Sequence, residues 1–261
     1  MKTAAPRFDT KTVDEFTIRD ERSFRGLGLY NDLKGVLQRA NYPFRVLPRS
    51  LAGRWDRALL LNLTYWGAEA GGDVLVEELE PDVVAHAAWH HLAAKALPST
   101  NGVASAASLF LGESIASAFD VYLVGRLLRA APKAAFLESQ VPAMASAAMG
   151  AGLPESDFEA MLMGMAESPE GAFEDLRELL YDATTTLYES TDAESAMVAL
   201  AKLDGHRFAP ILHHYELSNW VLYARAYAKP ELDERARDLD LALRRAKDGA
   251  IDWLTKTWLS G

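Results

Sequence analysis

Apolar residues recur with helical spacing over most of the chain after residue 80. Runs of this kind occupy 82–97, 103–130, 155–166, 168–190, 193–203, 208–228 and 230–259. Signals for helix starts accompany them: Pro81 suits a first helical position and Asp192 suits an N-cap. The pattern predicts a mainly α, multi-helix fold.

The N-terminal third is less regular. Residues 1–25 are charged and weakly patterned, which predicts an N-terminal arm ahead of a single helical domain over 26–261. The runs 57–66 and 73–79 are rich in Leu, Val and Tyr and flank a glycine pair, so they predict a small β hairpin. The first run fits a buried helix equally well, because a short apolar run does not decide between the two.

Composition narrows the possible chemistry. The net charge of −10 argues against nucleic acid as a partner, since phosphate binding needs a basic surface. The chain has no cysteine, which excludes disulfides, thiol catalysis and cysteine-ligated metals. A bound metal must therefore be held mainly by His, Asp and Glu. No dinucleotide-binding, P-loop or α/β-hydrolase motif occurs, so no organic cofactor is expected.

The first residues contain no apolar run of the secretory type. The longest weakly charged stretch, 103–125, contains Glu113 and Asp120, and either carboxylate would be costly near the centre of a bilayer. We expect this stretch to be a buried helix of a soluble, cytoplasmic protein that has no membrane partner.

Two histidines and one glutamate form the most informative constellation. His86 and His90 are four residues apart, so both imidazoles lie on one helix face. The short loop at 98–102 makes the next helix, which carries Glu113, an antiparallel neighbour. Two imidazoles and a carboxylate suit zinc or ferrous iron. The sequence therefore predicts a metal site made of His86, His90 and Glu113, called the HHE group below.

Two aspartates are expected to support this site. Asp82 lies one turn before His86, and a ligating histidine usually donates its second N–H to a carboxylate or carbonyl. Asp120 lies two turns after Glu113 on the same face. The alternative is purely structural: Glu113 and Asp120 pair with Arg126, Arg129 or a histidine and carry no chemistry.

The HHE group resembles the metal site of the gluzincin metallopeptidases. That family has the motif HExxH on one helix and a glutamate ligand on the next, often followed by an aspartate that orients a ligand histidine. The resemblance covers about residues 58–128 and implies zinc, a peptide substrate, and Asp120 or Ser117 in the orienting position.

One departure from this family bears on catalysis. The residue after the first histidine is Ala87, where the family has the glutamate that acts as general base on the metal-bound water. Three interpretations follow. In the first, the chain is a metal-dependent hydrolase or oxygenase that has another proton acceptor and acts on a small-molecule or peptide substrate. In the second, it is a degenerate metallopeptidase kept as a non-catalytic interaction or scaffold protein. In the third, the spacing of the helical histidines is a coincidence.

A second polar cluster lies at residues 213–216, with His213 and Glu216 on a shared helix face. In gluzincins a histidine or tyrosine C-terminal to the metal motif stabilises the transition-state oxyanion. The resemblance gives this role to one of His213, His214, Tyr215 and Tyr223. Glu216 is a further candidate for proton transfer. Alternatively, the cluster completes a second metal position, in which Glu113 bridges two ions. The simpler interpretation is an amphipathic helix whose histidines face solvent.

Overall fold

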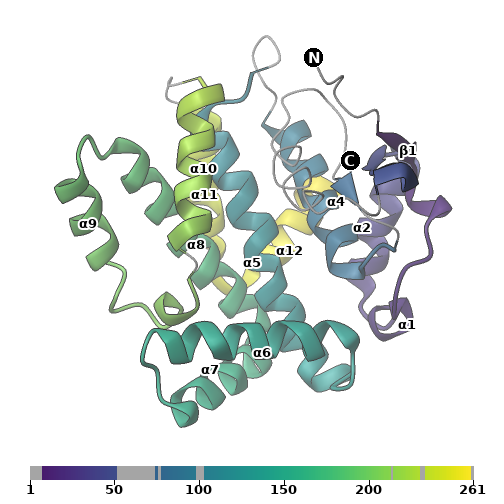
Figure 1. Cartoon of the computed structure of the whole chain (residues 1–261), viewed down its shortest axis with the longest axis horizontal. Helices are drawn as coiled ribbons and strands as arrows, with labels where there is room; N and C mark the ends of the chain where they lie inside the picture. The colour runs from purple at the N-terminus through teal and green to yellow at the C-terminus, as the bar shows by residue number, and fades with distance from the viewer. Residues whose placement is uncertain are drawn as a thin grey trace. The chain divides into compact units, whose positions relative to one another are not determined.

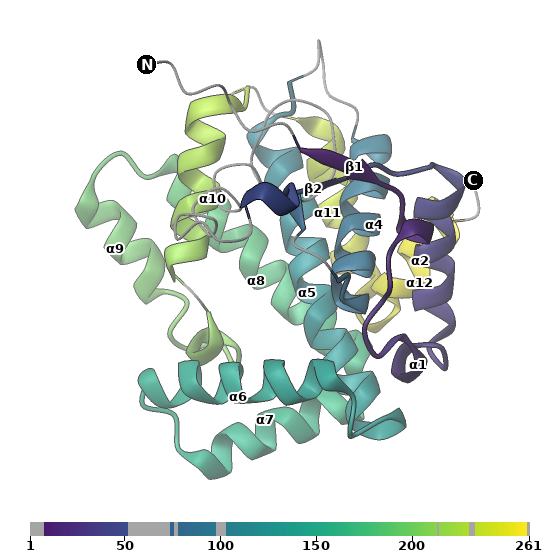
Figure 2. The same cartoon turned by 45° about the vertical axis from the view of Figure 1, so that its right-hand side comes forward.

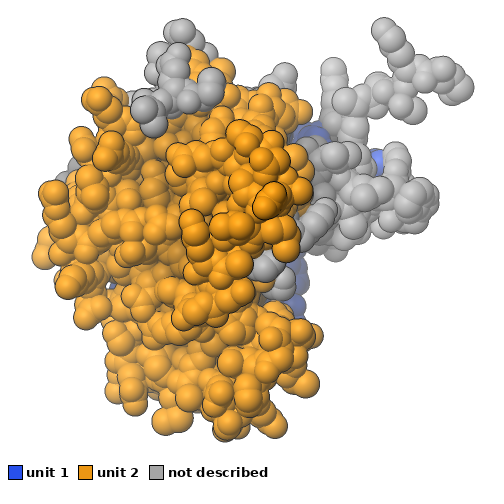
Figure 3. Space-filling view, turned by 90° about the vertical axis from the view of Figure 1, so that its left-hand side faces the viewer, with its two compact units in different colours: residues 1–88 blue, residues 89–261 orange. Residues whose placement is uncertain are grey.

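The computed structural model describes residues 8–51, 74–75, 78–97, 103–212, 214–229 and 233–259. Helices dominate these residues, as Figure 1 shows, and the predicted mainly α fold class is confirmed. The chain divides into two compact units, residues 1–88 and 89–261 (Figure 3). The division falls within helix α4 (Pro81–Ala96), so the helix that carries the two histidines belongs to both units.

The first unit contains a small sheet and two helices besides the start of α4. Strand β1 (Asp9–Lys11) pairs antiparallel with β2 (Phe44–Val46), and β2 pairs in parallel with β3 (Val74–Leu75). Helices α1 (Glu21–Phe24) and α2 (Gly28–Arg39) lie between β1 and β2 in sequence. Residues predicted as an arm thus include β1 and α1.

The predicted β element near residue 75 is present, with a partner that the sequence did not indicate. Strand β3 falls inside the run 73–79, and among the described residues it pairs with β2. The other half of the predicted hairpin, 57–66, lies outside the described residues. A parallel pair needs a crossover connection, and such pairing leaves no local turn signal in the sequence.

The second unit is helical in all its main elements. These are α5 (Ala106–Ala130), α6 (Ala135–Gly150), α7 (Glu155–Glu167), α8 (Pro169–Glu189), α9 (Ala193–Ala201), α10 (His214–Tyr227), α11 (Glu234–Ala246) and α12 (Ala250–Leu254). Short 3₁₀ turns precede α10 and α12, and a π-helical turn, Thr255–Leu259, follows α12.

Helix α5 is the centre of this unit. The Ser105 side chain accepts a hydrogen bond from the Ser108 amide at 3.0 Å and caps the helix, which then remains apolar on most of its circumference. By length and composition α5 could span a bilayer, but 78% of its most apolar window is buried within the protein. The expectation of a buried helix over 103–125 is confirmed.

Helix α8 packs along α5, and α6 and α7 form a hairpin across one end of this pair (Figure 1 and Figure 2). The crossing of α5 and α7 depends on Gly125. A Cβ added there would lie 2.2 Å from the Met165 carbonyl oxygen, so only glycine allows this approach.

A buried ionic network joins α8 to α11. The guanidinium of Arg177 is fully buried, donates to both carboxylate oxygens of Glu174 at 2.6 and 2.7 Å, and donates to Asp240 at 2.8 Å. Arg244 donates to the other oxygen of Asp240 at 2.8 Å. The guanidinium of Arg177 therefore links a carboxylate of α8 to a carboxylate of α11.

One predicted helix is divided in the structure, and one observed helix was not predicted. The run 230–259 is not one helix, because Lys247 has φ of 50° and ends α11 before Asp248 and Gly249 form a 3₁₀ turn. Helix α6 was not predicted, because Pro142 lies in its interior and proline normally ends a helix.

Candidate metal centre

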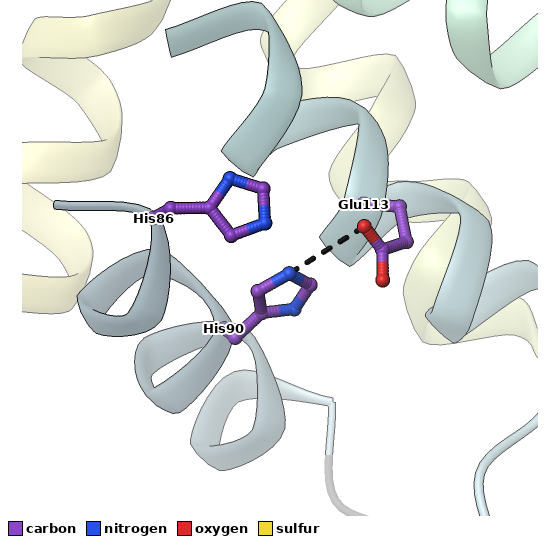
Figure 4. Close-up of side chains that lie close together, drawn as sticks. All are labelled: His86, His90 and Glu113. Carbon is purple, nitrogen blue, oxygen red and sulfur yellow. Dashed lines mark ion pairs between the residues drawn. The ribbon is translucent and has the colours of Figure 1, made fainter. Parts of the chain in front are cut away.

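The structure brings the three predicted ligands together. One ligand atom from each of His86, His90 and Glu113 lies within 4.8 Å of the other two. The two imidazoles project from successive turns of α4 and the Glu113 carboxylate projects from α5 (Figure 4). His90 Nε2 lies 3.5 Å from Glu113 Oε2, marked by the dashed line in Figure 4.

Small and aromatic residues set the register of α4 against α5 beside Glu113. Gly112 faces Ala93, and a Cβ at Gly112 would lie 3.5 Å from the Ala93 methyl group, so the two backbones approach closely there. The fully buried Trp89 packs edge-on against Phe119, with ring centroids 5.5 Å apart. These two contacts hold the turn containing His90 opposite the turn containing Glu113.

The geometry of the HHE group fits a metal ion. Donors bound to one tetrahedral zinc at about 2.1 Å lie about 3.4 Å from one another. The His90–Glu113 separation of 3.5 Å already matches this value, and the 4.8 Å limit on the whole group can be reduced by side-chain rotation. Glu113 is 9% exposed while both histidines are partly exposed. Three protein donors with partial solvent access leave coordination positions for water or substrate.

Asp82 lies in the first turn of α4, one turn before His86. Burial, with a smaller contribution from the charge of the neighbouring Glu80, raises the pKa of its carboxyl group to about 6. Hydrogen bonding to the backbone amides of Asp82 and Val83 lowers this pKa and only partly offsets the effect of burial. Its predicted role as an orienting partner of His86 stays a prediction.

Tyr223 of α10 and Glu216 are the candidates of the second polar cluster whose side chains the structure describes. Burial raises the pKa of the Tyr223 phenol, and the charges of Tyr227 and Glu113 raise it further. The phenol therefore stays protonated at neutral pH and can donate a hydrogen bond. His213 lies outside the described residues, as do the side chains of His214 and Tyr215.

His206, which precedes this cluster, has a local structural contact. Its Nδ1 accepts a hydrogen bond from the Phe208 amide at 3.2 Å, and burial lowers its pKa. This arrangement stabilises the turn before α10.

Asp120 and Glu216 lie together, in the wall of a cavity of about 320 Å³. Ser117 and Gln140 also line it. Asp120 is two turns from Glu113 along α5, which corresponds to about 10 Å at 1.5 Å per residue. No sequence signal pointed to Gln140, because its helix, α6, was not predicted.

Ala87, which stands where the gluzincins have their general base, is part of the core. Ala87 is fully buried, so a longer side chain there would need to displace neighbours or enter the HHE group. The arginines considered as structural partners of the acids bind other groups: Arg126 pairs with Glu170 at 3.4 Å, and Arg129 donates to the Ala166 carbonyl at 3.4 Å. Glu113 pairs with His90, which agrees both with a metal site and with the histidine partner of the purely structural alternative.

Comparison with known proteins adds no family assignment. The chain matches no protein-family model, no curated protein and no solved structure. The resemblance to the gluzincins therefore depends on the HHE group alone.

Proposed function

We propose that the chain is a metal protein whose centre is the HHE group, with zinc as the first choice of ion and ferrous iron as the alternative. The observation that carries the proposal is the convergence of two imidazoles and one nearly buried carboxylate from two helices. Two histidines and one carboxylate form catalytic zinc sites and also the facial triad of ferrous oxygenases. A bound ion of either kind would supply an acidified water or an oxygen-binding position.

The activity supported best is metal-dependent hydrolysis if the bound ion is zinc. If the ion is iron, the corresponding activity is oxygenation of a substrate. The charge of Glu113 raises the pKa of the Tyr223 phenol, which is protonated at neutral pH. This phenol could donate a hydrogen bond to an oxyanion that forms beside the HHE group. Proton transfer by Glu113 would remove a ligand, so another residue must accept the proton. Glu216 in the neighbouring cavity, a histidine of the second cluster and a residue still to be identified are the candidates for that acceptor.

A non-catalytic metal protein is the second proposal, and Ala87 is the observation that favours it. The family that the HHE group resembles needs a glutamate in this place, and here the position holds a fully buried methyl group. Such a chain would keep the metal as a structural link between α4 and α5 and act through its surface, as a degenerate metallopeptidase would.

The first test is the metal content of the purified protein by plasma mass spectrometry. We expect about one zinc or iron per chain, lost in the His86→Ala/His90→Ala variant. The control is His206→Ala, which removes a histidine that bonds only a local amide. If neither ion binds the wild type after incubation with zinc and with anaerobic ferrous iron, the metal proposal fails.

Catalysis is tested separately on the metal-loaded protein with peptide and ester substrates. A zinc hydrolase should lose activity in Tyr223→Phe while keeping its metal. If wild type is inactive and Ala87→Glu gains hydrolysis without loss of fold, the degenerate-peptidase interpretation is supported. If wild type and Ala87→Glu both bind zinc and neither hydrolyses any substrate, hydrolysis is excluded and the non-catalytic proposal leads.

A further inference from the structure

Helix α9 is apolar in sequence and exposed in the structure. Its polar residues are Glu194 and Ser195, yet Ala199 is its one buried residue. The helix packs against α8 at the outer edge of the second unit, as Figure 1 and Figure 2 show. Met197 and Val198 are 65% and 53% exposed. Because an apolar helix is normally buried, this face indicates a covering surface that the described residues of the chain do not supply.

The exposed face of α9 consists of two neighbouring rows of residues four apart. All members are exposed, and they are Ala193, Met197 and Ala201 in the alanine row and Glu194, Val198 and Lys202 in the charged row. The alanine row has a long side chain between two methyl groups, so it has the same order of sizes in both directions. The charged row has an acid at one end and a base at the other, so its charges are complementary to those of an identical row that runs the opposite way.

Twofold symmetry would bring these rows together. Two helices related by a twofold axis perpendicular to both run antiparallel, and each row then faces the same row of the other copy. Glu194 would lie opposite Lys202 of the partner subunit at both ends of the contact, and Val198 would meet its own equivalent at the centre. Parallel packing would instead place the two copies of Glu194 opposite each other, which the repulsion of like charges opposes.

A groove beside the charged row has space and charge for such a partner. It has a volume of about 470 Å³ and lies between this row and the end of α8. The other charged residues described in its wall, Glu189 and Asp192, are acids that flank the start of α9. They add negative charge at the end where the partner's Lys202 would lie, which strengthens the preference for the antiparallel arrangement.

We propose that the two rows of α9 form a contact between two copies of this chain, packed antiparallel about a twofold axis. Stable interfaces bury about 1,200 Å² or more in total, and a helix of nine residues, about 14 Å long, supplies less than this. The dimer is therefore weak and reversible, with an expected dissociation constant on the order of 10–100 µM. It needs no metal, so it does not depend on the HHE group.

The absence of cysteine from the chain allows a direct crosslinking test. Met197→Cys places one thiol in each copy near the proposed axis, and a disulfide forms only where two Cβ atoms come within about 4.5 Å. Under mild oxidation at equal concentration, we expect this variant to give a covalent dimer at least about 10-fold faster than Met163→Cys, whose residue on α7 is 64% exposed. Equal rates for the two thiols, or no covalent dimer, would overturn the proposal.

Charge reversal tests the antiparallel pairing by sedimentation velocity. Wild type should shift from monomer to dimer between about 5 and 500 µM. Glu194→Lys and Lys202→Glu each leave two like charges in the charged row, so each variant should remain monomeric, while their equimolar mixture should recover the dimer. The control is Glu159→Lys, which makes the same change of charge at an exposed position of α7 and should dimerise as wild type does.

Circular dichroism checks that each charge variant keeps the helix content of wild type. If one of them loses helix, the crosslinking of Met197→Cys decides the proposal. A wild type that remains monomeric at about 500 µM would leave another protein as the occupant of this face and would overturn the proposal. A dimer that persists in both charge variants, or a mixture that stays monomeric while wild type dimerises, would overturn it as well.

Discussion

Removing the buried guanidinium of Arg177 is the sharpest test of how the second unit is held together. Arg177→Met keeps the length of the side chain but leaves the carboxylates of Glu174 and Asp240, which are 5% and 6% exposed, without their shared partner. Asp240 keeps its bond to Arg244, so most of the cost arises at Glu174. Breaking one side of a buried ion pair costs about 3–5 kcal/mol, a large part of the stability of a typical domain.

The assay is urea unfolding at pH 7 followed by circular dichroism. The surface pair Arg207–Asp175, with side chains 42% and 51% exposed, supplies the control, and Arg207→Met should cost about 1 kcal/mol or less. Glu174→Leu/Arg177→Met removes the stranded carboxylate together with its partner and should recover at least half of the loss. A cost below about 1 kcal/mol for Arg177→Met, or no recovery in the double variant, would refute the reasoning.

The pH dependence of the same variant has a definite sign. Burial already raises the pKa of Glu174 in the wild type, although hydrogen bonds and charge from Arg177 lower it. Without Arg177 that pKa rises further. A carboxyl group whose folded pKa exceeds its unfolded value gains stability from protonation as pH falls. The penalty of Arg177→Met should therefore be smaller at pH 5 than at pH 7.5, and a larger penalty at pH 5 would contradict the assignment.

Three further predictions concern the chain outside this network. The carboxyl group of Asp82 has a pKa of about 6 in the folded protein and about 3.9 in the unfolded chain, so its ionisation lowers stability as pH rises from 4 to 6. Asp82→Asn should therefore raise the melting temperature at pH 7.5 and leave it nearly unchanged at pH 4. A lower melting temperature at pH 7.5 would contradict this prediction. Gly125→Ala should lower the free energy of unfolding in urea by about 1–3 kcal/mol, because the added Cβ meets a backbone carbonyl. Gly112→Ala should lower it by less, because its Cβ would make an ordinary 3.5 Å contact. Equal losses would show that α7 moves away freely. Zinc at 100 times its dissociation constant should stabilise the folded protein by about 2.7 kcal/mol, measured as a rise in melting temperature that is absent in His86→Ala/His90→Ala.

Local patterns predicted the helices that matter most for the site. The i, i+4 spacing of His86 and His90 and the isolated Glu113 identified the HHE group, since a carboxylate in an apolar helix needs a partner. The register between α4 and α5 was not predictable, because it depends on which small residues meet. The contact of Gly112 with Ala93 resembles many other alanine and glycine positions in these helices.

Features that depend on distant contacts left no local signal. The pairing of β2 with β3 joins segments about 30 residues apart, and the cavity wall combines α5, α6, α8 and α10. Asp120 and Glu216 were each noted for their charge, but their presence in the wall of one cavity depends on how α5 packs against α10. Lys247 ends α11 through its positive φ, a conformation for which a lysine gives no warning.

The central claim is that His86, His90 and Glu113 hold one metal ion together. A crystal structure of the protein grown with zinc, with anomalous data recorded on both sides of the zinc edge, tests it most directly. We predict one strong anomalous peak about 2.0–2.2 Å from a nitrogen of each histidine and an oxygen of Glu113. Zinc bound only at other residues, or no peak between α4 and α5, would contradict the account.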